Sequence, residues 1–158
     1  MIIVSACLLG IKCRYDGESR FDKELLSLMP DTVFIPVCPE QLGGLPTPRF
    51  PAQINNGSGF DVLNGQAQVI NTNDDDVTEN FLKGAEEVKK IVQLMKIDTA
   101  IMKENSPSCG VLYIKRDDII INGMGVTSAL LNSIGIKLIS SEKVTEEYVR
   151  HYNHRKRH

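Results

Sequence analysis

The sequence lacks several patterns that would assign a function directly. It has no close cysteine pair of the kind that binds structural zinc and no run of closely spaced cysteines typical of ferredoxins. It also has no glycine-rich loop with a Walker lysine, and no internal repeat, low-complexity tract or linker that would divide the chain. The function must therefore be inferred from where individual residues lie along the fold.

Long apolar segments and an excess of basic charge are missing too. The apolar N-terminus meets a charge by Lys12 and has no basic region before it, so we expect neither a signal peptide nor a membrane span. The formal net charge of −2 excludes a generally basic surface that coats nucleic acid. Only the tail over 150–158 is locally basic; it could contact RNA or phosphate, but we favour a solvated terminus. We expect a cytoplasmic protein.

What is present is an alternation of short β-branched runs and longer helical stretches. The runs predict buried parallel strands over 2–6, 33–37, 98–102 and 136–140. The patterns between and after them predict helices over 22–29, 77–96, 127–135 and about 141–152. Hairpin signals occur over 60–70, around Asn64 and Gly65, and over 111–125, around Asp117 and Asp118.

This pattern defines a fold class. At 158 residues the chain is long enough for one core without disulfides. We predict a single three-layer, Rossmann-like α/β domain over 1–158, with a mostly parallel sheet of about four central strands and hairpin insertions.

Three cysteines follow predicted strands. Cys7 comes after 2–6, Cys38 after 33–37, and Cys109 lies in the loop after 98–102. The carboxyl ends of parallel strands meet at one edge, where ligands bind, so three strands can deliver three thiols to one place. Each cysteine taken alone is better explained as a buried thiol. The three together favour a metal site, because three such thiolates suit zinc with an open position or a [4Fe-4S] cluster with one iron free of protein. Cys13 lies in the first loop, and the sequence indicates less clearly where its side chain points.

Five segments resemble a known family. They are "VSACLLGIKCRYDG" (4–17), "PVCPEQLGGLPTPRFPA" (36–52), "VTENFLKGA" (77–85), "KENSPSCG" (103–110) and "GMGVTSALL" (123–131). Together they are similar to the thiouracil desulfurase, or desulfidase, family, once known only as domain of unknown function 523. The resemblance implies a [4Fe-4S] enzyme that converts 2-thiouracil to uracil and sulfide without net redox change. It implies Cys7, Cys38 and Cys109 as cluster ligands, with Cys13 outside the set. Gln53 is a departure, because the family often has glutamate there.

The remaining polar residues of these motifs are candidates for catalysis. Glu40 lies two residues from Cys38 and is our leading general base, although an arginine-paired loop carboxylate would look the same. Ser106 and Ser108 flank the Cys109 turn and can hold water or orient the substrate, or can serve the turn alone. Lys103 can stabilise developing negative charge, or can be an ordinary exposed lysine.

A second group is a candidate for substrate binding. Arg14 with Asp16, and Arg49, can recognise a pyrimidine through paired donors and acceptors, or can pair with one another to hold the loops. The segment 123–131 is weak as a phosphate cradle, and we interpret it as tight strand-to-helix packing in which Thr127 can line the pocket.

Two other functions remain open at this stage. One is desulfuration of a thiolated nucleotide or tRNA, and the other is an iron–sulfur or sulfide carrier without a catalytic pocket. The expected partner is a small thiolated pyrimidine, and no membrane is involved. Because a cluster with a free iron is readily oxidised, we expect it to be lost in aerobic preparations.

Overall fold

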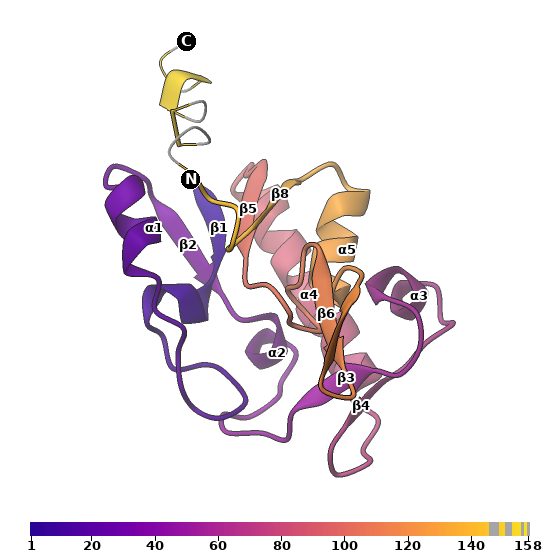
Figure 1. The fold of residues 1–158 in the computed structure, drawn as a ribbon. Coiled ribbons are helices and arrows are strands. Elements are labelled where there is room, and N and C mark those ends of the chain that lie inside the picture. The colour runs from indigo at the N-terminus through magenta and orange to yellow at the C-terminus, as the bar shows by residue number, and fades with distance from the viewer. Residues whose placement is uncertain (146–148, 151–152, 156, 158) are drawn as a thin grey trace.

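A four-stranded parallel sheet forms the centre of the fold. The computed structural model describes residues 1–145, 149–150, 153–155 and 157. The sheet has the strand order β2-β1-β5-β8, visible from left to right in Figure 1. Its strands are β1 (Ile2–Ser5), β2 (Phe34–Val37), β5 (Thr99–Met102) and β8 (Lys137–Ser140). All four predicted strands are confirmed, and because they run parallel their carboxyl ends share one edge.

Helices cover both faces of this sheet. The longer ones are α1 (Lys23–Leu28), α4 (Thr78–Leu94) and α5 (Val126–Ser133). Ile2 packs in one core cluster with Leu25 of α1, whereas Ile3 packs in another with Val88 of α4 and Leu131 of α5. Consecutive strand residues point to opposite faces, so both faces of the sheet are buried. The predicted three-layer α/β fold is confirmed.

Helix α4 shows how the sequence pattern produces a covering helix. Phe81, Ala85, Val88 and Val92 recur every three or four residues and are all buried. The helix begins two residues after Asp76, whose side chain accepts a hydrogen bond from the Thr78 amide at 2.9 Å. That carboxylate satisfies one of the amides that the first helical turn leaves without a partner.

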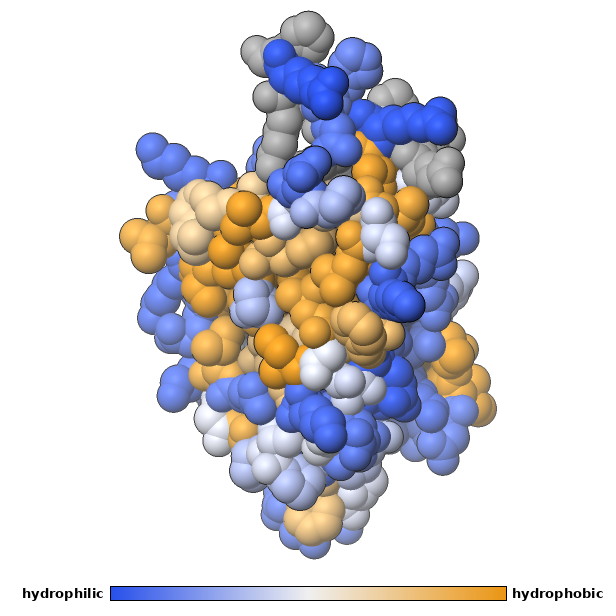
Figure 2. Space-filling model, turned by 90° about the vertical axis from the view of Figure 1, so that its left-hand side faces the viewer, coloured by the Kyte–Doolittle hydropathy of each residue, from blue (hydrophilic) through white to orange (hydrophobic). Residues whose placement is uncertain are grey.

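The α1 side of the sheet is covered less completely. On that side α1 is a single helix of six residues, about 10 Å wide with its side chains, while four strands span roughly 19 Å. Figure 2 views the molecule from the left-hand side of Figure 1 and shows a broad apolar area framed by hydrophilic residues. Apolar side chains of the N-terminal segment such as Ile11, Phe21 and Val33 are exposed.

Two small antiparallel sheets decorate the fold. One pairs β3 (Ala52–Ile54) with β4 (Val69–Asn71), and the other pairs β6 (Tyr113–Arg116) with β7 (Ile119–Asn122). The hairpin predicted over 111–125 is confirmed. Its turn residues Asp117 and Asp118 have φ angles of 50° and 60°, the left-handed conformation that a two-residue hairpin turn requires.

The hairpin predicted over 60–70 is wrong. This segment starts with a short helix, α3 (Gly59–Leu63), which begins in a capping box between Ser58 and Asp61. Asn64 and Gly65 end that helix, and Gly65 has a φ of 75°. An Asn-Gly pair allows a helix to end as readily as it allows a hairpin to turn, and here the capping box favours the helix.

The remaining helix predictions differ from the structure mainly at their ends. Helices α1, α4 and α5 are confirmed within a few residues, but the residue that caps α5 is Gly125 instead of a threonine or serine. In the helix predicted over about 141–152, residues 141–145 are not helical, Val149 and Arg150 are, and 146–148 and 151–152 lie outside the described residues. Within the described part of the chain, no helix is long and apolar enough to span a membrane.

Candidate active site

A pocket of about 840 Å³ opens at the carboxyl edge of the central sheet. Its wall includes Ser5 and Val37, the last residues of β1 and β2, and Lys103, which directly follows β5. All four cysteines of the chain also line it, namely Cys7, Cys13, Cys38 and Cys109. The structure therefore brings together the three cysteines that follow predicted strands, and it adds the fourth.

Each of the three cysteines is held by an element that starts where its strand ends. Cys7 lies in the short 3-10 helix η1 (Ala6–Leu9) directly after β1. Cys38 is the N-cap of α2 (Pro39–Leu42), where Pro39 at the first helical position favours a helix start. Cys109 lies in the loop after β5, and its side chain is buried. These elements hold the three thiols on defined backbone positions.

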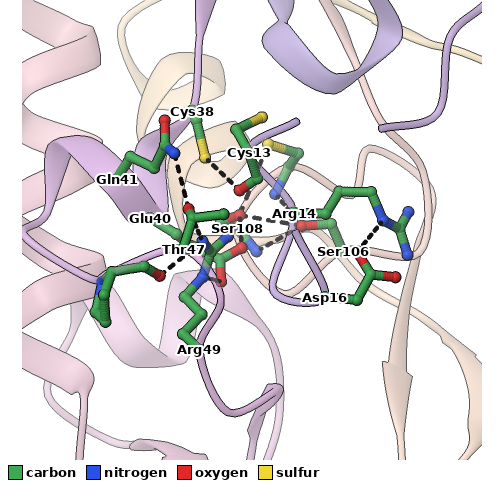
Figure 3. Close-up of polar contacts among 12 residues, drawn as sticks. Cys13, Arg14, Asp16, Cys38, Glu40, Gln41, Thr47, Arg49, Ser106 and Ser108 are labelled. Atoms are coloured by element: carbon green, nitrogen blue, oxygen red, sulfur yellow. Dashed lines mark hydrogen bonds and ion pairs between the residues drawn. The ribbon is translucent and has the colours of Figure 1, made fainter. Parts of the chain in front are cut away.

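Cys13 lies between Cys7 and Cys38. Its side chain is buried, and its thiol affects the pKa of the thiols of both Cys7 and Cys38. Its carbonyl oxygen also accepts a hydrogen bond from the Cys38 thiol at 3.6 Å (Figure 3). The sequence left the direction of this side chain open because Cys13 follows a turn and not a strand.

The thiols differ in their acidity. The Cys13 thiol donates a hydrogen bond that lowers the pKa of Cys7 despite its burial. The Cys38 thiol lowers the pKa of Cys13, but the hydrogen bond to Cys7 and burial together raise it to about 11. For Cys38, the hydrogen bond to Cys13 and burial together raise the pKa. For Cys109, burial raises the pKa to about 12. Buried thiols of this kind become thiolates when a bound cation balances their charge.

The segment 104–113, here called the cysteine loop, has its own frame of hydrogen bonds. The Ser106 hydroxyl oxygen accepts hydrogen bonds from the amides of Ser108, at 3.2 Å, and Cys109, at 3.1 Å. The first amides of α5 donate to carbonyl oxygens of the loop, Val126 to Pro107 at 2.8 Å and Thr127 to Ser108 at 2.9 Å. Because these amides are already used, this helix terminus serves the loop and is not a phosphate cradle.

Close packing at one glycine makes that contact possible. A Cβ atom on Gly125 would lie within 2.8 Å of the backbone of Ser108 and Cys109. The sequence interpretation of "GMGVTSALL" as tight strand-to-helix packing agrees with this contact.

Glu40 connects three segments of the pocket. One carboxylate oxygen accepts a hydrogen bond from the Ser108 hydroxyl at 2.9 Å, and the other lies 3.2 Å from Nε of Arg49 (Figure 3). The Ser108 hydroxyl is also 3.0 Å from that of Ser106. Both partners of the ion pair are largely buried, with side-chain exposures of 5% for Arg49 and 16% for Glu40. The result is a continuous polar chain from Ser106 through Ser108 to Glu40, beside the thiols.

The other predicted site residues are distributed around this chain. Lys103 and Arg14 line the pocket. The Lys103 ammonium group donates to the Glu104 carbonyl oxygen at 2.9 Å, and Nε of Arg14 lies 3.6 Å from the Asp16 carboxylate. Asp16 and Thr127 are not among the residues that line the pocket. Thr127 is fully buried beneath the cysteine loop.

Gln53 lies at the rim, where its side-chain amide exchanges two hydrogen bonds with Asp117. Its nitrogen donates to the Asp117 carboxylate and its oxygen accepts from the Asp117 amide, both at 2.9 Å. A glutamine can donate and accept at once, which a carboxylate cannot, so the residue that departs from the family pattern ties β3 to the β6–β7 turn.

Sequence reasoning missed Glu104. This carboxylate is 1% exposed and lies at the start of the cysteine loop. The only sequence signal for it is a charged residue directly beside a buried strand and a cysteine motif. Charged residues are almost never fully buried without partners. Glu104 can therefore be recognised as a candidate functional residue only once its burial is known.

The donor set fits a metal cluster better than one ion. Ligands of one tetrahedral zinc lie about 4 Å from each other, because each is about 2.3 Å from the metal. Among the described residues, no three His, Cys, Asp or Glu side chains lie close enough to hold a single metal ion. Thiols that line one pocket without surrounding a single point suit a cluster, in which each thiolate binds a different iron.

The site can now be compared with known proteins. A sequence profile of the 2-thiouracil desulfurase family matches residues 2–143. The chain is 40% identical over 149 residues to the Uncharacterized protein YbbK of Bacillus subtilis (strain 168), a match that covers 92% of this chain and 99% of YbbK. It is also similar to the solved structure of the [4Fe-4S]-dependent thiouracil desulfidase TudS, with 38% identity and a TM-score of 0.77 over 90% of this chain and 91% of TudS.

The fold and the site together define a class of parallel α/β proteins that gather thiols and a glutamate–serine chain at the carboxyl edge of the sheet. Within that class, the chain belongs to the 2-thiouracil desulfurase family. The family predicted from the five sequence segments is therefore confirmed.

Proposed function

We propose that this protein is a [4Fe-4S]-dependent thiouracil desulfidase that hydrolyses 2-thiouracil to uracil and sulfide. The observation that carries this proposal is the convergence of Cys7, Cys38 and Cys109 with the polar chain that ends at Glu40. Water supplies the oxygen and two protons, and sulfur leaves as sulfide, so no electron acceptor is needed.

Cys7, Cys38 and Cys109 are the proposed ligands of the cluster. Cys7 and Cys38 directly follow β1 and β2, and Cys109 lies in the loop after β5, so the fold brings the three thiols to one pocket before any metal binds. When bound, the cluster supplies an iron atom without a protein ligand, which attracts the thiocarbonyl sulfur as a soft Lewis acid.

Glu40 is the proposed general base. Arg49 holds one of its oxygens, so the other stays directed at the Ser108 hydroxyl. A water molecule that donates to Ser106 or Ser108 can pass a proton along hydroxyl groups 3.0 Å apart to the carboxylate. The arginine pairing that competed with this role in the sequence is thus part of how Glu40 is oriented.

Substrate recognition is proposed for the basic residues of the pocket. Arg14 lines it and can donate to a pyrimidine carbonyl oxygen, while Asp16 orients the guanidinium group. Lys103 lines the pocket at the end of β5 and can stabilise negative charge that develops on the substrate. Arg49 and Thr127 contribute indirectly, through Glu40 and through the Ser108 carbonyl group.

Anaerobic turnover tests the proposal. The protein is reconstituted with iron and sulfide and freed of excess reagent. 2-Thiouracil is then added, and uracil and sulfide are measured. We expect equal amounts of both products over many turnovers. A loaded protein that releases no uracil would contradict the enzyme and favour the iron–sulfur or sulfide carrier.

A thiolated nucleotide is a second candidate substrate, favoured by the size of the pocket. A volume of about 840 Å³ is far larger than one pyrimidine ring and leaves room for a sugar and a phosphate. The described part of the basic C-terminal segment lies beside the N-terminus, beyond the amino ends of the strands (Figure 1). Because these described tail residues lie away from the pocket, they lend no support to a tRNA substrate, and we take a nucleotide as the second candidate. Comparing kcat/KM for 2-thiouracil and 2-thiouridine monophosphate decides between the two substrates.

Two wider features complete the proposal. The chain is proposed to act as one domain over 1–158. Its four cysteines are free thiols, which suits the reducing cytoplasm, where a cluster bound by thiolates can be assembled and kept.

A further inference from the structure

Glu104 is a buried carboxylate that the proposed chemistry does not use. One of its oxygens accepts three backbone hydrogen bonds, from Val111 at 2.8 Å, Leu112 at 3.0 Å and Tyr113 at 2.9 Å. Among the described residues, no cation forms an ion pair with it, and its second oxygen has no hydrogen-bond partner. Desolvating a carboxylate is costly, so this position has a specific use for the negative charge.

That use follows from which parts of the chain the carboxylate joins. Glu104 begins the cysteine loop, and the three amides belong to the residues at which the loop returns. A further hydrogen bond, from the Asn105 amide to the Tyr113 carbonyl oxygen at 3.2 Å, also joins the two ends of the loop. We call this junction of residues 104–105 with 111–113 the neck. Three hydrogen bonds to one charged acceptor are stronger than bonds to a neutral group, so they can hold a loop of this length closed.

The residues enclosed by the neck are those of the proposed active site. Between Glu104 and Val111 the chain carries Ser106, Ser108 and Cys109. Asn105 has a φ of 66°, a left-handed conformation that costs energy for a residue with a side chain. A loop that contains such a residue keeps its shape only when the contacts at its ends are strong.

We propose that Glu104 is a positioning residue, which closes the cysteine loop and so holds the Ser108 hydroxyl against Glu40 and the Cys109 thiol at the cluster edge. This inference rests on the proposed desulfidase function. Glu104 is among the residues that line the pocket, and its carboxylate contacts backbone amides of the loop; its proposed effect on the reaction is therefore exerted through the loop.

The first test replaces the charge and keeps the size, with Glu104→Gln. A neutral carboxamide holds the three amides less tightly, so we expect kcat per bound cluster to fall about tenfold to a hundredfold, with KM for 2-thiouracil changed less than threefold. Glu86→Gln makes the same change at an exposed position of α4, where it should leave kcat and amide exchange unaltered. A Glu104→Gln protein with lower stability but the parent kcat per cluster would overturn the proposal.

The second test needs neither the cluster nor activity. The Leu112 and Tyr113 side chains are 42% and 37% exposed, so burial alone does not explain slow exchange of their amides. We expect the Val111, Leu112 and Tyr113 amides of the cluster-free parent to exchange far more slowly than the amide of Asp118 in the β6–β7 turn, and at least tenfold faster in Glu104→Gln than in the parent.

Unprotected amides in the parent would overturn the role of Glu104 even if the variant fails to fold. If exchange behaves as expected but the loaded parent does not convert 2-thiouracil, the proposed function fails and the closure of the loop by Glu104 stands.

Discussion

At the scale of single residues, the polar groups of the site depend on partners far away in the sequence. Glu40 and Ser108 are 68 positions apart, yet their side chains meet at 2.9 Å. Arg49 holds the remaining oxygen of Glu40. A carboxylate held from both sides is already oriented toward the hydroxyl group that delivers the proton. Little conformational entropy is therefore lost in reaching the geometry that a general base requires.

Replacing Glu40 by glutamine tests this role. Glu40→Gln keeps the size and can still accept a hydrogen bond from Ser108, but it cannot take a proton from water. We expect the variant to keep its cluster and to bind 2-thiouracil, with kcat lower by about a hundredfold to ten-thousandfold. Anaerobic sulfide release measures the loss. Turnover near the parent rate would place the base elsewhere, with Ser106 or Ser108 the next residues to replace.

Cys13 allows the proposed ligand set to be tested. It contacts Cys7 and Cys38 but follows no strand end, and we expect Cys13→Ser to retain the iron content and visible absorbance of the parent. Serine at Cys7, Cys38 or Cys109 should remove most of both, because a hydroxyl group binds iron poorly. An equal loss from Cys13→Ser would show that Cys13 is a ligand.

At the scale of elements, the position of the site depends on close contact between α2 and α4. Gly43 and Gly84 face each other there: a Cβ atom on Gly84 would lie 1.9 Å from the Pro39 carbonyl oxygen, and one on Gly43 would lie 2.0 Å from the Asn80 carbonyl oxygen. Because Cys38 caps α2 and Glu40 lies in its first turn, α4 determines where both side chains sit.

Gly84→Ala is therefore expected to destabilise the protein. In an open helix this change stabilises by about 1 kcal/mol, but here the methyl group collides with backbone and should cost about 1 to 3 kcal/mol. Moving α2 should also lower the iron bound per chain. Urea unfolding and iron analysis measure the two effects, with Lys83→Ala, at the exposed neighbouring position, as the control. A Gly84→Ala protein more stable than the parent would show that the helices do not touch.

The start of α4 gives a prediction with a defined pH dependence. The side chain and the amide of Thr78 donate to Asp76 and hold its pKa below the usual value. A carboxyl group with a lowered folded pKa stabilises the protein above its unfolded pKa, near 3.9, and this contribution is lost as the pH falls through the folded pKa. Asp76→Ala should cost about 0.5 to 1 kcal/mol at pH 7.

Urea unfolding of the parent and Asp76→Ala at pH 7 and near pH 3 measures that difference. It should shrink at the lower pH, because the parent carboxylate is then becoming protonated. A difference that stays constant would mean that Asp76 acts through packing and not through its charge.

At the scale of the whole molecule, three strands contribute to one site, and a bound cluster would link them. Groups that bind only the folded state raise its stability, so a cluster held by Cys7, Cys38 and Cys109 should act as a cross-link between β1, β2 and β5. The folded protein and the loaded site are then coupled.

Anaerobic preparation should show this coupling. We expect about four iron and four sulfide per chain, and an unfolding temperature several degrees above that of the cluster-free protein. Calorimetry before and after removal of iron by a chelator, under nitrogen, measures the shift. One equivalent of zinc with no iron after reconstitution would contradict the cluster. Exposure to air should lower both the iron content and the unfolding temperature.

The sequence by itself determined the sheet, its edge and the family. These features depend on local patterns, because the preferences that form a strand or a helix act over a few residues. The patterns are the short β-branched runs, the cysteines after three of them, and the spacing of Phe81, Ala85, Val88 and Val92. The prediction for 60–70 was wrong although it also used a local pattern. There the Asn-Gly pair indicated a hairpin and the capping box at Ser58 indicated a helix, and the helix forms.

Only the tertiary structure decided which side chains meet. The pairing of Glu40 with Arg49 and Ser108, the place of Cys13 between two thiols, and the three amides that converge on Glu104 join segments whose separation the sequence pattern does not encode. Burial decides such partners, because a charged group that leaves water must find hydrogen bonds wherever packing places them. Burial arises only when the whole chain has packed.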